Sequence, residues 1–89
     1  MIKILSGKYK GRKLNHIKGN FIRPTQAIVR KSIMDSIMIF GNKRILDLCC
    51  GVGTLGIESL SRGSEYVKFV DKNQKALSIL IKNLQVLDV

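Results

Sequence analysis

Three glycines at fixed spacing and two nearby acids have the residue types needed to hold a nucleotide-like cofactor. Gly51, Gly53 and Gly56 spell G-x-G-x-x-G, with Asp47 four residues before the first glycine and Asp71 twenty residues after it. Glycines let a backbone adopt unusual φ and ψ angles and approach a ligand closely. A helix that begins in such a loop offers unpaired N–H groups, and the later acid can accept hydrogen bonds from a ribose. The pattern therefore predicts a cofactor loop.

The segments around the glycine motif have the order that such a loop needs. The apolar run 44–50 is typical of a strand buried on both faces of a parallel sheet, and residues 54–61 have a helical pattern. Residues 66–70 are expected to form a second strand that ends at Asp71, and residues 73–87 a second helix. The sequence thus predicts an α/β fold with a parallel βαβ unit and a following helix. The expected apolar face of the last helix comprises Ala76, Leu77, Leu80, Ile81, Leu84 and Leu87.

The first part of the chain has different signals. Residues 2–5 and 12–14 are expected to form a β-hairpin with a long loop. Residues 15–24 are expected to form an exposed connection. A helix is predicted over 26–40, with Thr25 as its N-cap and Gly41 after its end. Its expected apolar face includes Ile28, Val29, Ile33, Ile37 and Phe40, and is widened by Met34, Met38 and Ile39. These signals divide the chain into a hairpin with its connection at 1–24 and a helix plus half of a cofactor-binding domain at 25–89.

Positive charge is concentrated in the first half of this 89-residue chain, which is long enough for one small domain. Residues 1–44 contain 11 of the 16 lysines and arginines and one acid, Asp35, whereas residues 45–89 contain five basic and five acidic residues. Such a one-sided excess favours a polyanionic partner, most often nucleic acid. No apolar run reaches the roughly 18–20 residues of a membrane span and no signal peptide is recognisable, so the expected location is the cytoplasm, without membrane association.

The two cysteines do not form a recognisable metal or redox motif. Cys49 and Cys50 are adjacent, which matches neither C-x-x-C nor a zinc-binding spacing. Successive residues of a strand point to opposite faces, so a shared metal is not expected. The sequence therefore predicts two small apolar residues beside a core, and no metal site.

The position of Asp47 favours one class of cofactor over another. The acid lies at the end of the predicted buried strand, where a carboxylate is costly unless it has partners. Its negative charge directly behind the loop disfavours a pyrophosphate, as in NAD, and favours the amino group and sulfonium of S-adenosylmethionine. A second interpretation is a hydrogen bond that braces the loop, and both roles can coexist.

Three motifs together resemble the RsmD-type family of methyltransferases, and the resemblance extends over the whole chain. Residues 7–14, GKYKGRKL, are similar to the family's hairpin motif ending in G-R-K-L. Arg23-Pro24-Thr25, followed by Val29 and Arg30, is similar to its R-P-T-x-x-x-V-R motif, and residues 47–58, DLCCGVGTLGIE, to its cofactor motif. These enzymes transfer a methyl group from S-adenosylmethionine to the N2 of a guanine in 16S ribosomal RNA of the small subunit. The resemblance implies a Rossmann-like class I methyltransferase sheet, here incomplete.

The resemblance also implies roles for individual residues. The cofactor site would be formed by Asp47, Gly51, Gly53, Gly56 and Asp71, with Asp71 binding the ribose hydroxyls. The RNA side would be formed by Arg12, Lys13, Arg23 and Arg30. Glu58 matches a family position that has either a structural or a cofactor-binding role.

The chain departs from the family pattern at several points. Lys31 replaces a frequent acid, and Val52 replaces the usual serine between the first two glycines. Family members are roughly twice as long and contain a D-P-P-F/Y tetrad, whereas the only proline here is Pro24. That tetrad aims the target amine at the methyl group, which methyl transfer requires. No catalytic residue is therefore expected within this chain.

Three functional interpretations remain open. The first is a truncated or split RNA guanine-N2 methyltransferase that acts on ribosomal RNA or the small ribosomal subunit. The second is a non-catalytic RNA-binding remnant, which would bind RNA without a cofactor, and the third is a dinucleotide-binding fragment. The class I strand order that the resemblance implies would leave an unpaired apolar edge at residues 45–50. Such an edge predicts that the isolated chain is unstable or self-associates, or that it pairs with a C-terminal fragment.

Overall fold

Two short sheets and three helices form the part of the chain that the computed structural model describes, residues 2–15, 27–37, 40–41, 43–48 and 50–88. The elements are β1 (Ile2–Lys3), β2 (Lys13–Leu14), α1 (Ala27–Ser36), β3 (Arg44–Leu48), α2 (Thr54–Ser61), β4 (Tyr66–Val70) and α3 (Gln74–Val86). The predicted α/β order of hairpin, helix, strand, helix, strand and helix is therefore confirmed.

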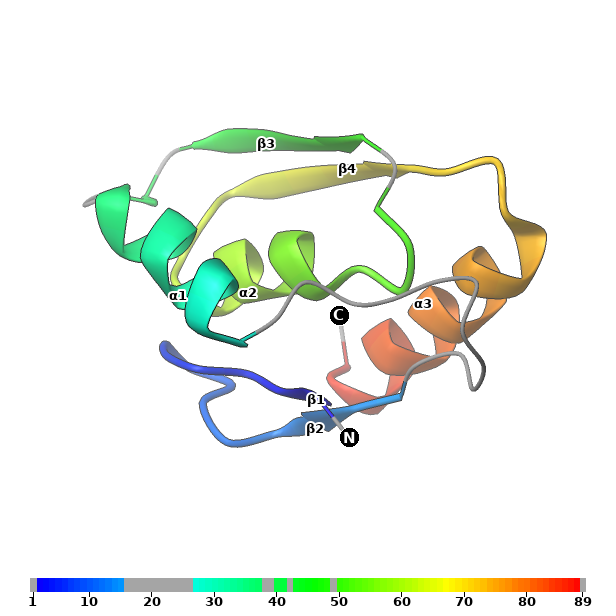
Figure 1. Ribbon diagram of the computed structural model, residues 1–89, viewed down its shortest axis with the longest axis horizontal. Helices are drawn as coiled ribbons and strands as arrows, with labels where there is room; N and C mark the ends of the chain where they lie inside the picture. Colours follow the sequence, from blue (N-terminus) through cyan, green and yellow to red (C-terminus); the bar gives the residue numbers. More distant parts are fainter. Residues whose placement is uncertain (1, 16–26, 38–39, 42, 49, 89) are drawn as a thin grey trace.

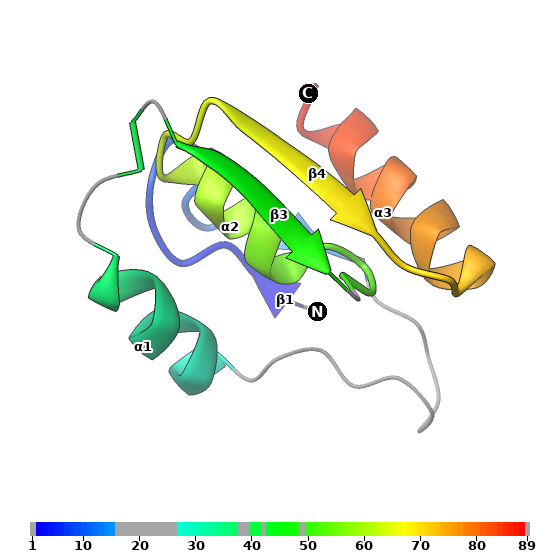
Figure 2. The same ribbon diagram turned by 90° about the horizontal axis from the view of Figure 1, so that it is seen from above.

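The elements are stacked in layers (Figure 1), with the β3–β4 sheet on one side, the three helices beneath it and the β1–β2 hairpin beneath the helices. Strands β3 and β4 are parallel, with Asp47 opposite Phe69 and Leu48 opposite Val70. From above, α1 lies beyond the free edge of β3, and α3 lies on the side of β4 (Figure 2). The parallel pairing predicted for the βαβ unit is confirmed.

The core lies between the helices, the sheet and the hairpin. Its main buried cluster comprises Ile4, Leu14, Cys50, Ile57, Leu80 and Leu87, with Phe69 of β4 packed against them. Two of these residues, Ile4 and Leu14, belong to the hairpin, which is thus attached to the rest of the fold by apolar burial.

Helix α3 begins as predicted but buries a partly different face. The side chain of Asn73 accepts a hydrogen bond from the backbone N–H of Ala76 (2.9 Å) and caps the helix. Ala76 and Leu80 are buried, but Ile81, predicted for the apolar face, is 55% exposed. Asn83, which is polar and was not predicted for this face, is buried. Its side-chain amide forms hydrogen bonds with backbone groups.

Helix α1 differs most from the prediction. It ends at Ser36. It buries Met34, as predicted, but also Arg30, which was not expected on its buried side. Ile28, predicted for its apolar face, is 83% exposed, and Ile33 is also exposed. The side of α1 that carries Arg30 packs against α2 and the hairpin, so much of the predicted apolar side faces outward. The predicted N-cap, Thr25, lies outside the described residues, as does the division at residue 24, which stays a prediction.

Strand β3 was predicted to be buried on both faces, and that expectation is wrong for this structure. Leu46 and Leu48 are 57% and 64% exposed, because every described helix lies on the opposite face of the sheet (Figure 1). Val70, beside Leu48 on β4, is exposed too. Self-association through the β3 edge stays a prediction.

Two kinds of feature are missing from the described part of the chain. None of its helices is long and apolar enough to cross a membrane. Nor do its cysteine and acidic side chains form a group of three that could hold a metal ion.

Candidate functional site

The glycine loop joins the end of β3 to the start of α2. The backbone N–H of Cys50 donates to the carbonyl oxygen of Val70 (3.0 Å), and that of Gly53 donates to Cys50 (2.9 Å). Gly53 is the N-cap of α2 and has φ +89°, without a hydrogen bond from any capping side chain. The first N–H groups of α2 therefore begin at the carboxyl edge of the sheet, a common place for ligands in α/β folds.

The three glycines of the motif are required for different physical reasons. A side chain at Gly51 (φ +57°) would meet no atom within 4 Å, so this face of the loop is open. At Gly53 a Cβ atom would lie 2.3 Å from Cδ1 of Leu80, and at Gly56 it would lie 2.3 Å from Cε1 of Phe69. Gly51 thus leaves room for a ligand. Gly53 lets the loop pack closely against Leu80 of α3, and Gly56 lets α2 pack closely against Phe69 of β4.

Asp71 is connected directly to this loop. Its Oδ2 accepts a hydrogen bond from the backbone N–H of Gly51 (2.8 Å), and its Oδ1 accepts one from Asn73 (2.8 Å). The hydrogen bond from Asn73, followed by that from Gly51, holds the pKa of Asp71 below its ordinary value. Two residues twenty positions apart are therefore brought into contact, and the carboxylate stays ionised beside the open glycine.

Asp47 binds the last glycine of the motif, within α2. Its Oδ2 accepts a hydrogen bond from the backbone N–H of Gly56 (3.1 Å). Burial raises the pKa of Asp47; the bond from Gly56 opposes this, and the negative charge of Asp71 adds to it. The two carboxylates thus influence each other across the glycine loop. The bracing interpretation of Asp47 corresponds to a bond that the structure contains.

Cys50 does not contribute a reactive thiol to the site. Its side chain is buried, and burial, followed by the charges of Asp47 and Asp71, raises its pKa to about 11. A thiol with such a pKa is protonated at neutral pH and is a weak nucleophile. Cys49 lies outside the described residues.

Glu58, on the inner side of α2, is a buried hydrogen-bonding centre. It is 1% exposed, and its two oxygens accept hydrogen bonds from the backbone N–H groups of Leu5 (2.9 Å) and Ser6 (3.0 Å). Nε of Arg62 donates to Oε2 (3.0 Å), and Nε of Arg30 lies 3.9 Å from Oε1. Of the two roles implied by the sequence, these contacts correspond to the structural one.

The basic residues predicted to face RNA have different surroundings. Arg30 is 3% exposed, and its Nη2 donates to the backbone oxygen of Lys3 (2.7 Å). Nη2 of Arg12 donates to the carbonyl oxygen of Val86 at the end of α3 (3.0 Å). Lys13 is exposed on β2, and Arg23 lies outside the described residues. The structure therefore places Arg12 and Lys13 at the surface and Arg30 in the interior.

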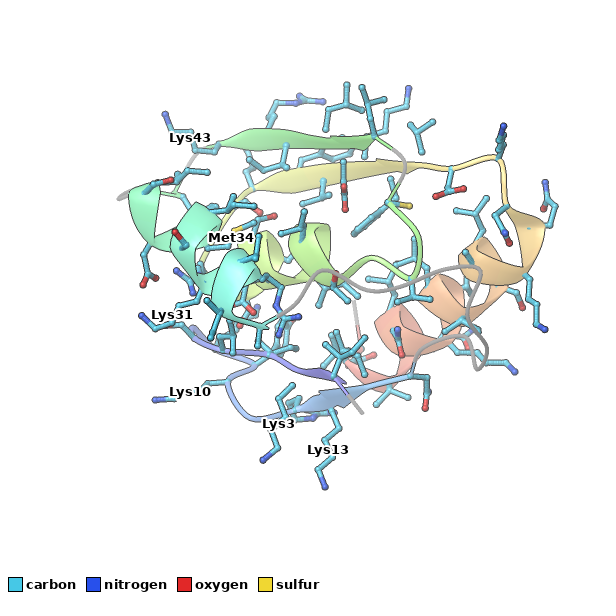
Figure 3. The ribbon with its side chains drawn as sticks, in the orientation of Figure 1. Lys3, Lys10, Lys13, Lys31, Met34 and Lys43 are labelled. Carbon is cyan, nitrogen blue, oxygen red and sulfur yellow. The ribbon has the colours of Figure 1, made fainter. Side chains whose placement is uncertain are left out.

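The hairpin has a cationic face that the sequence pattern alone did not single out. Lys3 lies directly opposite Lys13 in the antiparallel β1–β2 pair. Lys3 and Lys13 point away from the helices, and Lys10 extends sideways from the hairpin loop (Figure 3). Like charges directly opposite each other destabilise a sheet, and residues 2–15 contain no acid to compensate them. That absence of acids was the available signal, but the pairing register was needed to find the face.

Comparisons with known proteins agree with one another. Residues 2–89 match the family described as Conserved hypothetical protein 95. The chain is 43% identical over 89 residues to "Putative rRNA methyltransferase YlbH" of Bacillus subtilis, covering 99% of this chain and 48% of that protein. It is 33% identical over 87 residues to "Ribosomal RNA small subunit methyltransferase D" of Haemophilus influenzae, covering 97% of this chain and 45% of that protein.

A solved structure shows the same architecture. The chain superimposes on "Putative methyltransferase yhhF" of Escherichia coli with a TM-score of 0.87 and 30% identity, covering 99% of this chain and 47% of that one. The chain thus spans about half the length of the relatives that it matches.

Proposed function

The chain belongs to the Conserved hypothetical protein 95 family, the RsmD-type family that its motifs resemble, and on this premise we propose that it is part of an rRNA methyltransferase. The proposed donor is S-adenosylmethionine and the proposed acceptor is the exocyclic N2 of a guanine in 16S ribosomal RNA. The names of the two curated relatives support the ribosomal RNA substrate. In this proposal the chain binds the donor and the RNA, and the residues that aim the acceptor amine belong to the half of the relatives that this chain does not match.

One observation carries the cofactor proposal. Two carboxylates bind the two ends of the glycine motif: Asp71 accepts from Gly51, whose face is open, and Asp47 accepts from Gly56. Asp71 would accept hydrogen bonds from the ribose hydroxyls, and the negative charge of Asp47 would favour a cationic ligand over a pyrophosphate. When bound, S-adenosylmethionine supplies an electrophilic methyl group on a sulfonium.

Titration calorimetry of the chain with S-adenosylmethionine, and separately with NADH, tests this site. We expect heat of binding with S-adenosylmethionine and none with NADH. Binding of NADH alone would favour a dinucleotide-binding fragment. Binding of ribosomal RNA without either cofactor, even when a C-terminal half of a relative is added, would favour an RNA-binding remnant.

The replacement Asp47→Asn is expected to have opposite effects on stability and cofactor binding. Because burial raises the pKa of Asp47, the folded state holds its proton more tightly than the unfolded state does. The wild-type free energy of unfolding therefore falls as pH rises through the range just above the ordinary value of 3.8. Asparagine carries no charge at any pH, so the variant does not lose stability in this way. Urea unfolding should therefore show a more stable protein at neutral pH, while the affinity for S-adenosylmethionine falls because the negative charge is gone. A variant that is less stable at neutral pH would contradict this account.

The hairpin lysines provide a test of RNA binding. A lysine that neutralises one phosphate contributes roughly one unit to the slope of log affinity against log salt. We therefore expect the double variant Lys3→Ala, Lys13→Ala to lower the slope by about two in gel-shift titrations with a 16S ribosomal RNA transcript. The double variant Lys68→Ala, Lys82→Ala removes the same charge from exposed positions elsewhere, and an equal decrease there would show that only net charge matters.

The exposed apolar surfaces support a further polypeptide partner. Leu46, Leu48 and Val70 on the sheet, and Ile28 and Ile33 on α1, are exposed. Parallel sheets are usually covered on both faces. We propose that a polypeptide corresponding to the C-terminal half of the relatives covers these surfaces. Sedimentation distinguishes this partner from a second copy of the chain: a complex that forms only when a C-terminal half of a relative is added supports the proposal, whereas a dimer of the chain alone contradicts it.

A further inference from the structure

The basic hairpin, residues 2–15, is fastened to the helix that begins in the glycine loop. Helix α2 starts next to Gly53 and ends at Ser61. Its eight residues span about 12 Å at 1.5 Å per residue. The hairpin contacts the last turn of this helix, at Glu58 and Ser61, so a single rigid element connects the proposed cofactor loop with the proposed RNA-binding surface.

Glu58 makes the central connection. Leu5 and Ser6, in the hairpin loop, both donate backbone N–H groups to its carboxylate, although they lie 53 and 52 residues away in the chain. Arg62, the C-cap residue directly after α2, donates to the same carboxylate. Arg30, beside Glu58, donates to the backbone oxygen of Lys3 and thereby holds the first strand of the hairpin as well.

The end of α2 fits the hairpin loop closely. The backbone N–H of Lys8 donates to the carbonyl oxygen of Ser61 (2.8 Å). The hydroxyl of Ser61 accepts from the N–H of Tyr9 (3.0 Å) and donates to the oxygen of Ser6 (2.6 Å). Gly7 has φ +88°, and a Cβ atom there would lie 1.9 Å from the Ser61 oxygen. Only glycine therefore permits this approach.

Asn83 of α3 forms a second anchor between the hairpin and the glycine loop. Its Oδ1 accepts from the N–H of Asn15 (2.8 Å), and its Nδ2 donates to the oxygen of Asn15 (3.0 Å). The same Nδ2 donates to the carbonyl oxygen of Val52, within the glycine motif (3.3 Å). One buried amide thus touches the backbone of both functional segments.

We propose that Glu58, with Asn83 as a second anchor, is a positioning residue that holds the basic hairpin at a fixed place relative to the cofactor loop. RNA bound by Lys3, Lys10 and Lys13 is thereby presented at a set distance from the methyl donor. This inference rests on the proposed function, since the position of the hairpin matters only if its lysines bind RNA.

A fixed hairpin also binds RNA more tightly than a mobile one with the same charge. Ordering a loop and its side chains on binding costs free energy, and a segment that is already ordered avoids this cost. Release of the hairpin is therefore expected to lower RNA affinity about tenfold, while the affinity for S-adenosylmethionine stays within about twofold of the wild-type value.

The first test compares Glu58→Gln with Asp35→Asn. Both replacements remove one negative charge, and both residues bind Arg62. Asp35 is exposed, however, and its carboxylate pairs with Lys31 and Arg62 rather than with the hairpin backbone. If charge alone governs RNA binding, both variants bind more tightly than wild type. We expect Glu58→Gln to bind a 16S ribosomal RNA transcript about tenfold more weakly and Asp35→Asn to bind it no more weakly than wild type.

The second test leaves every charge unchanged and does not depend on the folding of the Glu58 variant. Gly7→Ala introduces the collision with Ser61, whereas Gly11→Ala has a similar positive φ (+82°) but no atom within 4 Å of the added Cβ. Hydrogen exchange of the amides of Leu5, Ser6, Lys8 and Tyr9 reports whether the hairpin is released. We expect faster exchange and weaker RNA binding in Gly7→Ala than in Gly11→Ala.

The readouts separate failure of this inference from failure of the proposed function. Weaker RNA binding by Glu58→Gln and Gly7→Ala, with cofactor affinity retained, supports the positioning role. RNA affinity equal to wild type in both variants, or an equal decrease in the two controls, overturns it while RNA binding by the wild type still stands. A wild-type chain that binds no RNA transcript overturns the RNA part of the proposed function, and the positioning role with it.

Discussion

Replacement of Asp71 by alanine is expected to lower the affinity for S-adenosylmethionine about a hundredfold, since hydrogen bonds to a charged group are among the stronger ones in proteins. The carboxylate holds the N–H groups of Gly51 and Asn73, and in the proposed complex it also accepts the ribose hydroxyls. The alanine removes both contributions at once. Titration calorimetry at neutral pH measures the effect, because the pKa of Asp71 lies below its ordinary value and the wild-type carboxylate is fully ionised there.

The matched control for this prediction is Glu65→Ala. Glu65 is an exposed acid just before β4, so the replacement removes the same charge away from the glycine loop. We expect it to leave cofactor affinity within about twofold of wild type, as exposed charges are screened by salt. Equal decreases in the two variants would mean that Asp71 acts only through long-range charge and would exclude the proposed ribose contact.

Replacement of Gly56 by valine is expected to lower the free energy of unfolding by about 2 kcal/mol. Valine has a slightly better helix propensity than glycine, worth a few tenths of a kcal/mol. Against this gain, the first added carbon would lie 2.3 Å from Cε1 of Phe69 and 2.9 Å from Cγ1 of Val67. Overpacking of this kind costs about 1–3 kcal/mol, so the collision between α2 and β4 outweighs the propensity.

Urea unfolding followed by circular dichroism measures this decrease, which is a large fraction of the roughly 5–15 kcal/mol that stabilises a typical domain. The control Gly41→Val has no atom within 4 Å of its added Cβ and no positive φ, and we expect a change within about 0.5 kcal/mol. A Gly56→Val protein as stable as wild type would show that Phe69 and Val67 move aside at no cost, and that this glycine is not needed for packing.

The second half of the fold was predictable because its signals are local. The bounds of α2 at 54–61 and of β4 at 66–70 agree with the prediction, and Asn73 caps α3 as expected. A cap, a helix-ending glycine and a short apolar run each act on residues within a few positions. Neighbouring structure does not need to be known for such signals to be interpreted correctly.

The buried faces were less predictable, because periodicity shows that an element has an apolar side but not what covers it. Ile33 of α1 and Leu48 of β3 have the expected pattern and are nevertheless exposed. Arg30 and Asn83 are polar but are buried, because each finds partners supplied by the hairpin. Burial of a polar side chain depends on such partners, and these come from distant parts of the chain.

The sequence by itself determined the glycine loop, the two acids at strand ends, the parallel βαβ order and the positive first half. These features depend only on residue type and on spacing along the chain, and both are known without the fold. Only the tertiary structure decided that Asp71 binds Gly51, that Lys3 and Lys13 lie side by side, and that Glu58 holds the hairpin. The reason is physical. The contacts of Asp71 and Glu58 join residues far apart in the chain, so packing of the helices against the hairpin and the sheet brings them together. The opposition of Lys3 and Lys13 depends on the pairing register of the hairpin, which residue type and spacing leave open.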